Sequence, residues 1–235
     1  DEVIRCSMEL GGNAPFLVLA DANVDDAVAG AMLAKMRNGG AACTAANRFY
    51  VAKEIAKEFT EKLTKAMGAL KVAPGLETGA QLGASVSVKE RNKIAQLVDD
   101  SVTNGAKINV GGKSVDGSGA FYPATVLIVD KDNPILLHEI FGPVAPIIIF
   151  DTDEEGIKLA NDTEFGLISY VFSSNLTRAL RTAEAMESGM VAINKGVISD
   201  PAAPFGGVKQ SGLGREGGFD GIHEFLQTKF IGVEI

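Results

Sequence analysis

The stretch Val144-Ala-Pro-Ile-Ile-Ile-Phe150 is the most apolar short run of the chain. A continuous apolar run of this length is typical of a strand that is buried on both faces. It is far shorter than the roughly 20 residues that a membrane-spanning helix needs, and it contains Pro146. We therefore predict a buried strand over Pro146–Phe150 and no membrane span.

Similar short runs, rich in apolar or β-branched residues, recur along the chain between longer amphipathic stretches. Strand and helix alternation at this spacing predicts an α/β fold, with a layered, mostly parallel sheet and flanking helices. The further strands expected are Phe16–Leu19, Phe49–Ala52, Lys107–Val110, Thr125–Val129, Ile168–Phe172 and Met190–Ile193.

Helix boundaries are marked by capping residues. Asn23 is a candidate N-cap for a helix over Val24–Met36, and either Ser174 or Asn175 for a helix that ends near Gly189. The end of the chain, Phe225–Ile235, is expected to form a final strand whose exposed edge invites pairing with another chain. The glycines suited to helix C-termini are Gly105 and Gly189.

Composition limits the classes of partner. The chain has 235 residues and is 46% hydrophobic, which is enough apolar material for a packed core. Its net charge of -8 repels nucleic acid phosphates and anionic membrane surfaces, so binding to either is disfavoured. Small molecules and other proteins remain as expected partners.

Two cysteines, Cys6 and Cys43, provide no disulfide framework and fit a reducing compartment. The first ten residues carry charges and no apolar stretch of secretory length, so we expect a cytoplasmic or matrix setting. Two histidines, His138 and His223, are too few and too isolated to suggest a metal site.

One glycine motif invites a nucleotide interpretation. Residues 212–217, Gly-Leu-Gly-Arg-Glu-Gly, match the dinucleotide pattern G-x-G-x-x-G. A true fingerprint follows a buried strand and opens a crossover helix, and neither is expected here so near the end of the chain. We therefore expect these glycines to serve tight loop or helix-start geometry.

Cys43 lies among small residues in Gly39-Gly-Ala-Ala-Cys-Thr-Ala-Ala46, directly after the expected helix that ends near Met36. By itself it could be a small buried hydrophobe. A nucleophilic role requires a feature that favours thiolate, and the candidates are the backbone amides of the glycine turn and nearby Arg37. Glu9, Glu139 and Phe141 also have ordinary readings: a solvated acid, a turn acid and a core ring.

Taken together, four segments resemble the aldehyde dehydrogenase superfamily, in order and spacing and across essentially all of the chain. Cys43 follows Glu9 by 34 positions, as the family's nucleophile follows its glutamate. The segments are Glu9-Leu-Gly-Gly-Asn13, similar to the general-base signature; the Cys43 segment; Glu139-Ile-Phe-Gly-Pro143, similar to E-x-F-G-P; and Pro204-Phe-Gly-Gly with Ser211-Gly-Leu-Gly-Arg-Glu216.

The resemblance implies a role for each matching residue. Cys43 would be the nucleophile and Glu9 the general base, with NAD or NADP as cofactor and a small aldehyde as substrate. Glu139 would hold the nicotinamide ribose, and Phe141 would border the nicotinamide ring.

Within the superfamily, the segments around Cys43 and before Pro204 resemble succinate-semialdehyde dehydrogenases. In that subclass the residues that match Arg37 and Ser199 hold the substrate's far carboxylate, a task that suits a guanidinium fork. The alternative is a surface charge and a turn hydroxyl. A dehydrogenase for glutarate semialdehyde or a small aliphatic aldehyde, and a non-catalytic structural or assembly fragment, also remain open.

The sequence departs from the family near the nucleophile. Ala41-Ala42 stands where the family usually has Gln and Thr or Cys, which puts the local packing and oxyanion contact in doubt. Ala45 replaces a second cysteine that some members of the subclass have, so a disulfide switch between those positions is not expected.

The resemblance covers only part of the family's length. Residues 1–224 match the catalytic domain and 225–235 the oligomerisation strand, while the dinucleotide-binding domain is expected to be absent. We therefore expect a homo-oligomer, or a complement of the missing cofactor domain, and no NAD(P)-dependent turnover by the chain alone.

Overall fold

Among the residues that the structure describes, seven strands form one central sheet, in the order β4-β5-β6-β3-β2-β8-β9. The structure is a computed structural model that describes residues 3–115, 117 and 119–235. Neighbouring strands run parallel, except that β4 lies antiparallel to β5 at one edge. The predicted mostly parallel sheet is confirmed. The strands are β2 Ala14–Val18, β3 Ala46–Ala52, β4 Lys107–Val110, β5 Thr125–Ile128, β6 Val144–Phe150, β8 Ile168–Phe172 and β9 Met190–Ile193.

Strand β3 differs most from its expected bounds. It begins at Ala46 rather than Phe49, and all of its residues are buried, including Asn47 and Arg48. The start of this strand was not predicted, because polar side chains such as Asn47 and Arg48 normally indicate a loop. Here each is buried with hydrogen-bond partners, which removes most of the cost of burying it.

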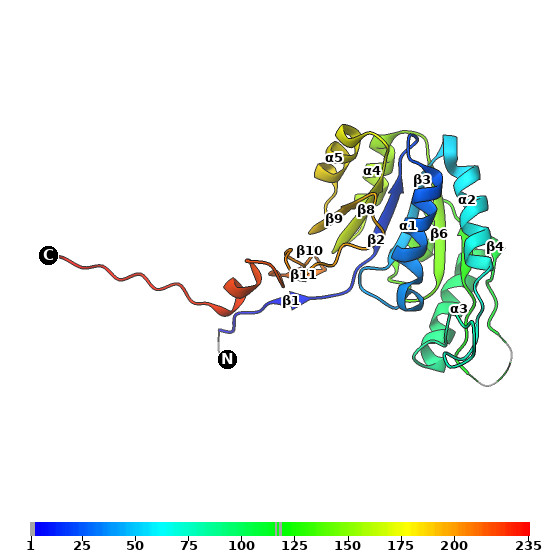
Figure 1. Ribbon diagram of the computed structural model, residues 1–235, viewed down its shortest axis with the longest axis horizontal. Coiled ribbons are helices and arrows are strands. Elements are labelled where there is room, and N and C mark those ends of the chain that lie inside the picture. Colours follow the sequence, from blue (N-terminus) through cyan, green and yellow to red (C-terminus); the bar gives the residue numbers. More distant parts are fainter. Residues whose placement is uncertain (1–2, 116, 118) are drawn as a thin grey trace.

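Helices cover both faces of the sheet (Figure 1). Helices α1, Val24–Met36, and α2, Lys53–Gly68, share one apolar cluster with the sheet. Helix α3, Val88–Thr103, and α4, Asp153–Asn161, share a second cluster on the other face. Helix α5, Leu176–Ala185, packs beside α4 against β8 and β9. The flanking helices of the predicted fold are thus confirmed.

The helix caps agree with the sequence except at one end. Asn23 caps α1, and Asn175, not Ser174, caps α5 by accepting a hydrogen bond from the Arg178 backbone N–H at 3.0 Å. The predicted end of this helix near Gly189 is wrong, because α5 ends at Ala185. The Gly189 N–H instead donates to the Gly166 carbonyl at 2.9 Å, immediately before β9. Gly105 does follow the end of α3, with a φ of 94°.

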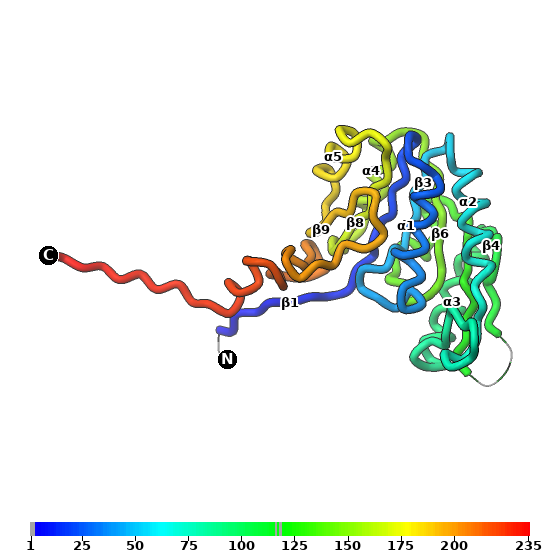
Figure 2. Tube along the Cα trace, viewed as in Figure 1, coloured from blue at the N-terminus to red at the C-terminus, as the bar shows by residue number. Residues whose placement is uncertain are grey.

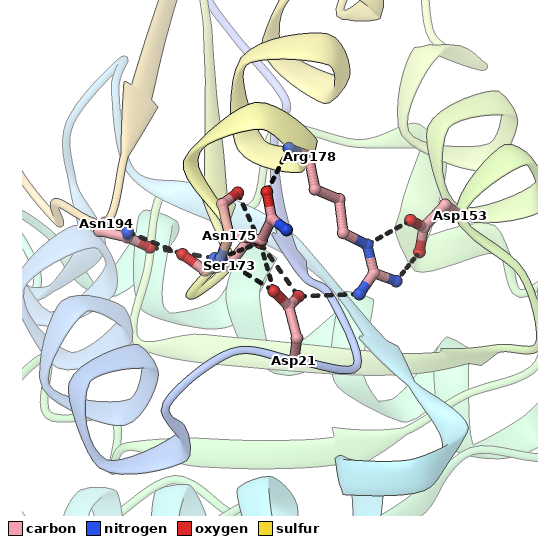
Figure 3. Close-up of polar contacts among 6 residues, drawn as sticks. All are labelled: Asp21, Asp153, Ser173, Asn175, Arg178 and Asn194. Carbon is pink, nitrogen blue, oxygen red and sulfur yellow. Dashed lines mark hydrogen bonds and ion pairs between the residues drawn. The ribbon is translucent and has the colours of Figure 1, made fainter.

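A polar network ties together the carboxyl ends of the parallel strands (Figure 3). The Arg178 guanidinium donates twice to Asp153 at 2.6 Å and once to Asp21 at 2.9 Å. The Ser173 hydroxyl donates to Asp21, and the Asn194 side chain bonds the Ser173 backbone in both directions. This network holds the loops that follow the strands at their carboxyl ends, whereas Glu9, Cys43 and Glu139 lie near the amino ends.

The end of the chain leaves the body of the protein. Strand β1, Met8–Glu9, pairs antiparallel with β11, Gly212–Leu213, and a 3-10 helix over Gly221–Phe225 follows. Residues 226–235 then run outward next to no other element (Figures 1 and 2). The strand expected over Phe225–Ile235 is therefore not formed within this chain, because no described strand lies beside it to complete a ladder.

A second short pair joins β7, Phe165–Gly166, to β10, Val208–Lys209. No described helix is long and apolar enough to cross a membrane.

Candidate active site

The candidate residues lie at the amino ends of three adjacent strands. Glu9 precedes β2, Cys43 precedes β3, and Glu139 with Phe141 precedes β6. Because β6, β3 and β2 are neighbours and run parallel, the loops that enter them meet at the same end of the sheet, where these strands begin. Segments far apart in the sequence are thereby brought together.

Gly12 is the point of contact between these loops. A Cβ atom there would lie 2.7 Å from the Cys43 carbonyl oxygen, so a larger residue would push the two loops apart. The Gly12 backbone N–H donates to Oε1 of Glu139 at 3.1 Å. One glycine therefore touches both the nucleophile loop and the candidate cofactor acid.

The nucleophile loop, residues 37–45, turns sharply after α1. Asn38, Gly39 and Gly40 all have positive φ, at 53°, 63° and 79°. Gly40 packs directly against the carbonyl of Gly142, so a side chain there would clash with the Glu139–Pro143 segment. This succession of left-handed residues explains the glycines of the segment, and it brings Cys43 back over the start of β3.

Cys43 is half-buried and lies against the Glu9 carboxylate. Burial and the negative charge of Glu9 raise the pKa of the Cys43 thiol, while the backbone N–H groups of Thr44 and Cys43 partly offset that rise. The predicted role of the glycine-turn amides in favouring thiolate is not supported, because the amides that lower the Cys43 pKa belong to Thr44 and Cys43. At rest, the protonated thiol is favoured.

The pKa of the Glu9 carboxyl is also raised. Partial burial raises its pKa first, and the charges of Glu216 and Glu139 raise it further, while the hydrogen bond with Cys43 lowers it. A carboxyl with a raised pKa, in contact with a thiol, is suited to accept and return a proton near neutral pH.

Arg37 does not act on the thiol. It is exposed, and its Nη2 donates to the Thr44 hydroxyl at 3.1 Å. Arg37 therefore braces the nucleophile loop, and its remaining donors are available to a ligand. The suggested effect of Arg37 on the Cys43 thiolate is not supported, because Arg37 is not among the charges that shift the Cys43 pKa.

Ser199 lies in the loop after β9 and is exposed. Gly196 of this loop packs against the Gly30 carbonyl and Leu33 of α1, less than two turns before Arg37. The loop therefore packs against the middle and second half of α1, which leads into Arg37. No hydrogen bond joins Arg37 and Ser199 among the described residues.

The C-terminal segment supports the Glu9 turn. The Ser211 hydroxyl donates to the Gly11 carbonyl at 2.7 Å and accepts from the Gly166 N–H at 3.0 Å. Gly212, Gly214 and Gly217 all have positive φ, at 130°, 82° and 67°. Tight loop geometry, as expected, accounts for these glycines, although no helix starts among them.

A cavity lies beside Phe141. Its volume is ≈ 420 Å³, and its lining includes Asn38 and Ala41 of the nucleophile loop. The Tyr122 hydroxyl, which is buried and has no partner among the described residues, also lines this cavity. Phe141 has a φ of 51°, a strained conformation for an aromatic residue that is characteristic of functional sites. The Phe141 ring beside this cavity, with the Glu139 carboxylate two residues before it, would suit a nicotinamide nucleotide.

Three buried residues that the sequence analysis did not predict support the loops of the candidate site by hydrogen bonds. The Tyr170 hydroxyl donates to the Thr44 carbonyl at 2.7 Å, and burial raises the Tyr170 pKa to about 12. Arg48 is buried and donates to the Asn13 carbonyl at 3.0 Å. Lys35 is fully buried and donates to Asn47 at 2.9 Å. For Lys35 a signal was available, because it falls on the apolar stripe of α1.

Cys6 is exposed, and neither cysteine forms a disulfide. Within residues 3–115, 117 and 119–235, no cluster of three His, Cys, Asp or Glu side chains could hold a metal ion.

Comparison with known proteins agrees with the geometry. A sequence model of the aldehyde dehydrogenase family matches residues 1–231. A succinate-semialdehyde dehydrogenase from Paenarthrobacter nicotinovorans is 54% identical over 232 residues, which are 98% of this chain and 52% of that protein. A glutarate-semialdehyde dehydrogenase from Pseudomonas putida is 44% identical over 100% of this chain and 48% of its own length.

Among solved structures, a succinate-semialdehyde dehydrogenase from Burkholderia pseudomallei superposes with a TM-score of 0.92 at 46% identity. The match covers 95% of this chain and 46% of that one. The chain spans about half the length of the relatives it matches.

Proposed function

Because the chain belongs to the aldehyde dehydrogenase family, we propose that it supplies the nucleophile and base of an enzyme that oxidises succinate semialdehyde to succinate. The observation that carries this proposal is the contact of Cys43 with Glu9, next to the Gly12 turn that binds Glu139. This proximity of a thiol to a carboxylate supports the proposal, because covalent aldehyde chemistry needs a nucleophile beside a base.

The first step is addition to the aldehyde. Glu9 takes the thiol proton, and the Cys43 sulfur attacks the carbonyl carbon to form a thiohemiacetal. The developing oxyanion is held in part by the Cys43 backbone N–H. The raised pKa of Glu9 makes it a stronger base for this task than an ordinary carboxylate.

NAD(P)+, when bound, supplies the hydride acceptor. Among the described residues, Glu139 would hold its ribose, and Phe141 would border its ring within the adjacent cavity. Glu139 is already fixed by the Gly12 N–H, so its carboxylate has a set position. The remaining cofactor contacts are proposed to come from residues outside this chain, since the chain spans about half of its relatives.

Hydrolysis completes the reaction. After oxidation a thioester remains on Cys43. Glu9 releases to solvent the proton that it took from the thiol, and it then removes a proton from the water that attacks the thioester. Breaking the C–S bond returns the thiol and leaves a carboxylic acid. The two steps use the same Glu9–Cys43 contact.

Arg37 and Ser199 are proposed to bind the far carboxylate of the substrate. Arg37 uses one nitrogen on Thr44, which orients the guanidinium and leaves donors for a second anion. Both relatives named above act on aldehydes that end in a carboxylate, succinate and glutarate semialdehyde, which favours an anion clamp.

Protection of Cys43 against iodoacetamide tests the proposal with the chain itself, because thiohemiacetal formation needs no hydride acceptor. Succinate semialdehyde is expected to protect at roughly tenfold lower concentration than butanal, and Arg37→Gln should remove this difference. Arg181→Gln, on the exposed face of α5, is the matched control. Equal protection by both aldehydes would overturn the clamp, and no protection by either would overturn Cys43 as the nucleophile.

Glutarate semialdehyde is the second candidate substrate, favoured by the relatives that are named for it. It differs from succinate semialdehyde by one methylene, which a clamp distinguishes by about 1–3 kcal/mol. Better protection by the longer aldehyde would favour this second candidate.

A further inference from the structure

Lys35 is a buried titratable group that the proposed reaction does not use. Its side chain is 0% exposed, although it is on α1, only eight residues before Cys43. Lysine is almost never fully buried without a compensating partner, since its charge loses hydration. The burial of this amine therefore requires a partner inside the protein.

The bond that Lys35 makes joins the two ends of the nucleophile loop. Its Nζ donates to Oδ1 of Asn47 at 2.9 Å, and Asn47 is 2% exposed at the start of β3. Lys35 lies two residues before Arg37, and Asn47 lies four residues after Cys43. A single buried hydrogen bond thus closes the loop at its base.

The loop also folds back onto Lys35. Gly40 is so placed that a Cβ atom would lie 3.2 Å from the Lys35 carbonyl oxygen. The same glycine packs against Gly142, which connects the loop to the Glu139–Pro143 segment. Opening of the loop would therefore break this packing against the backbone of Lys35.

The charges around Lys35 set its titration near neutral pH. Burial lowers its pKa from 10.5 to about 7, and the carboxylate of Glu139 offsets part of that decrease. Glu139 is the charged group that acts on Lys35, while Asn47 from β3 is a neutral partner. In water Lys35 would be protonated, whereas in its buried position near pH 8 it is mostly neutral.

We propose that Lys35 is a positioning residue that latches the nucleophile loop through Asn47, and that the loop opens by releasing the Lys35 side chain to water. The open loop takes up a proton that the closed loop does not bind. Opening is therefore favoured as the pH falls toward 7 and suppressed as the pH rises. The inference concerns the loop that the proposed function uses, but it does not depend on aldehyde oxidation.

Amide hydrogen exchange of residues 37–46 tests the latch in the intact chain, after correction for intrinsic exchange rates. Wild-type protection of this segment is expected to rise about sixteenfold between pH 7 and pH 8.5, because Lys35 of the closed loop is half protonated at pH 7 and the rise approaches tenfold per pH unit only above it. In Lys35→Met the rise should be absent. Lys57→Met, which changes an exposed lysine of α2, should behave as wild type.

Asn47→Asp provides a second variant that keeps the amine. A carboxylate beside Lys35 favours its charged form, so the rise in protection should move to higher pH. The ratio of Cys43 to Cys6 alkylation, normalised to the Cys43 thiolate fraction, should follow the same profile. These measurements do not involve oxidation, so failure of the latch and failure of the proposed function are distinguishable.

Two results would overturn the latch. One is protection of residues 37–46 as large as that of the most protected amides of the chain, because their exchange would then require global unfolding rather than a loop opening. The other is an NMR titration of the Lys35 side chain in the wild-type protein with a midpoint above about pH 9.5, close to that of an ordinary lysine. This titration needs no variant, so the proposal stays testable even where Lys35→Met fails to fold.

Discussion

The Tyr170 hydroxyl donates to the Thr44 carbonyl at 2.7 Å, which anchors the residue after the nucleophile to strand β8. Both residues are buried, with Tyr170 2% exposed and Thr44 5% exposed. The position of Cys43 thus depends on a hydrogen bond from the interior of the sheet, 126 residues further along the chain.

Tyr170→Phe should therefore destabilise the protein by about 1–3 kcal/mol, because it leaves a buried carbonyl without a partner. Urea denaturation measures the free energy of unfolding. Tyr122→Phe is the matched control, since the buried Tyr122 hydroxyl has no hydrogen-bond partner among the described residues. Its replacement should cost close to nothing. An equal decrease in the free energy of unfolding in both variants would show that the Tyr170–Thr44 hydrogen bond does not contribute to stability.

Glu9→Gln should make Cys43 more reactive toward iodoacetamide at pH 7.5, by at least about twofold. The substitution removes the negative charge that raises the Cys43 pKa, so the thiolate fraction at that pH increases. Alkylation followed by mass spectrometry gives the rate, with Cys6 in the same chain as the reference. Glu184→Gln on the exposed face of α5 should change nothing. A slower reaction in Glu9→Gln would contradict the Glu9–Cys43 contact.

The sequence was sufficient for the strands of the central sheet, and its resemblance to a known family singled out Glu9, Cys43 and Glu139. Apolar runs identify strands such as β8 to the residue, because burial on both faces leaves few alternatives. The meeting of Glu9, Cys43 and Glu139 follows from parallel neighbouring strands, whose amino ends share one edge. Short motifs at those ends are therefore informative before any coordinates are known.

The supporting residues were not predicted, for a physical reason. A lysine or an arginine in a sequence normally indicates a solvated surface, and the partners that make burial possible are distant in sequence. Lys35 falls on the buried stripe with Val24, Val28 and Ala31, at helical spacing, so the pattern held a signal. Arg48 gave none, because two of the groups that accept its hydrogen bonds, the Asn13 and Ala160 carbonyls, lie 35 and 112 residues away in sequence.

The stability of the protein should depend on the charge of Lys35. Its pKa is about 7 when folded and near 10.4 when unfolded, so between these values only the unfolded chain binds the proton. Stability therefore rises with pH through this window and is lowest below pH 7.

Relative to Lys35→Met, the free energy of unfolding of the wild type should increase by at most about 3 kcal/mol from pH 7 to pH 9. Comparing the two proteins cancels the titration of other groups. Urea denaturation at the two pH values gives the difference. Parallel pH profiles for the two proteins would show that Lys35 is not neutral in the folded state.

Arg48→Lys should be among the more damaging conservative changes in the chain. The Arg48 guanidinium donates to the Asn13 carbonyl at 3.0 Å, to the Ala160 carbonyl at 2.9 Å and to the Tyr50 hydroxyl at 3.1 Å. It therefore joins the end of the Glu9 turn to the last turn of α4, and an ammonium group cannot reach these acceptors in the same geometry.

We expect a loss of about 3 kcal/mol in the free energy of unfolding, since buried acceptors lose their partners. Arg181→Lys, at an exposed site on α5, should stay within about 0.5 kcal/mol of wild type. Similar small effects in both variants would mean that Arg48 does not organise this side of the site.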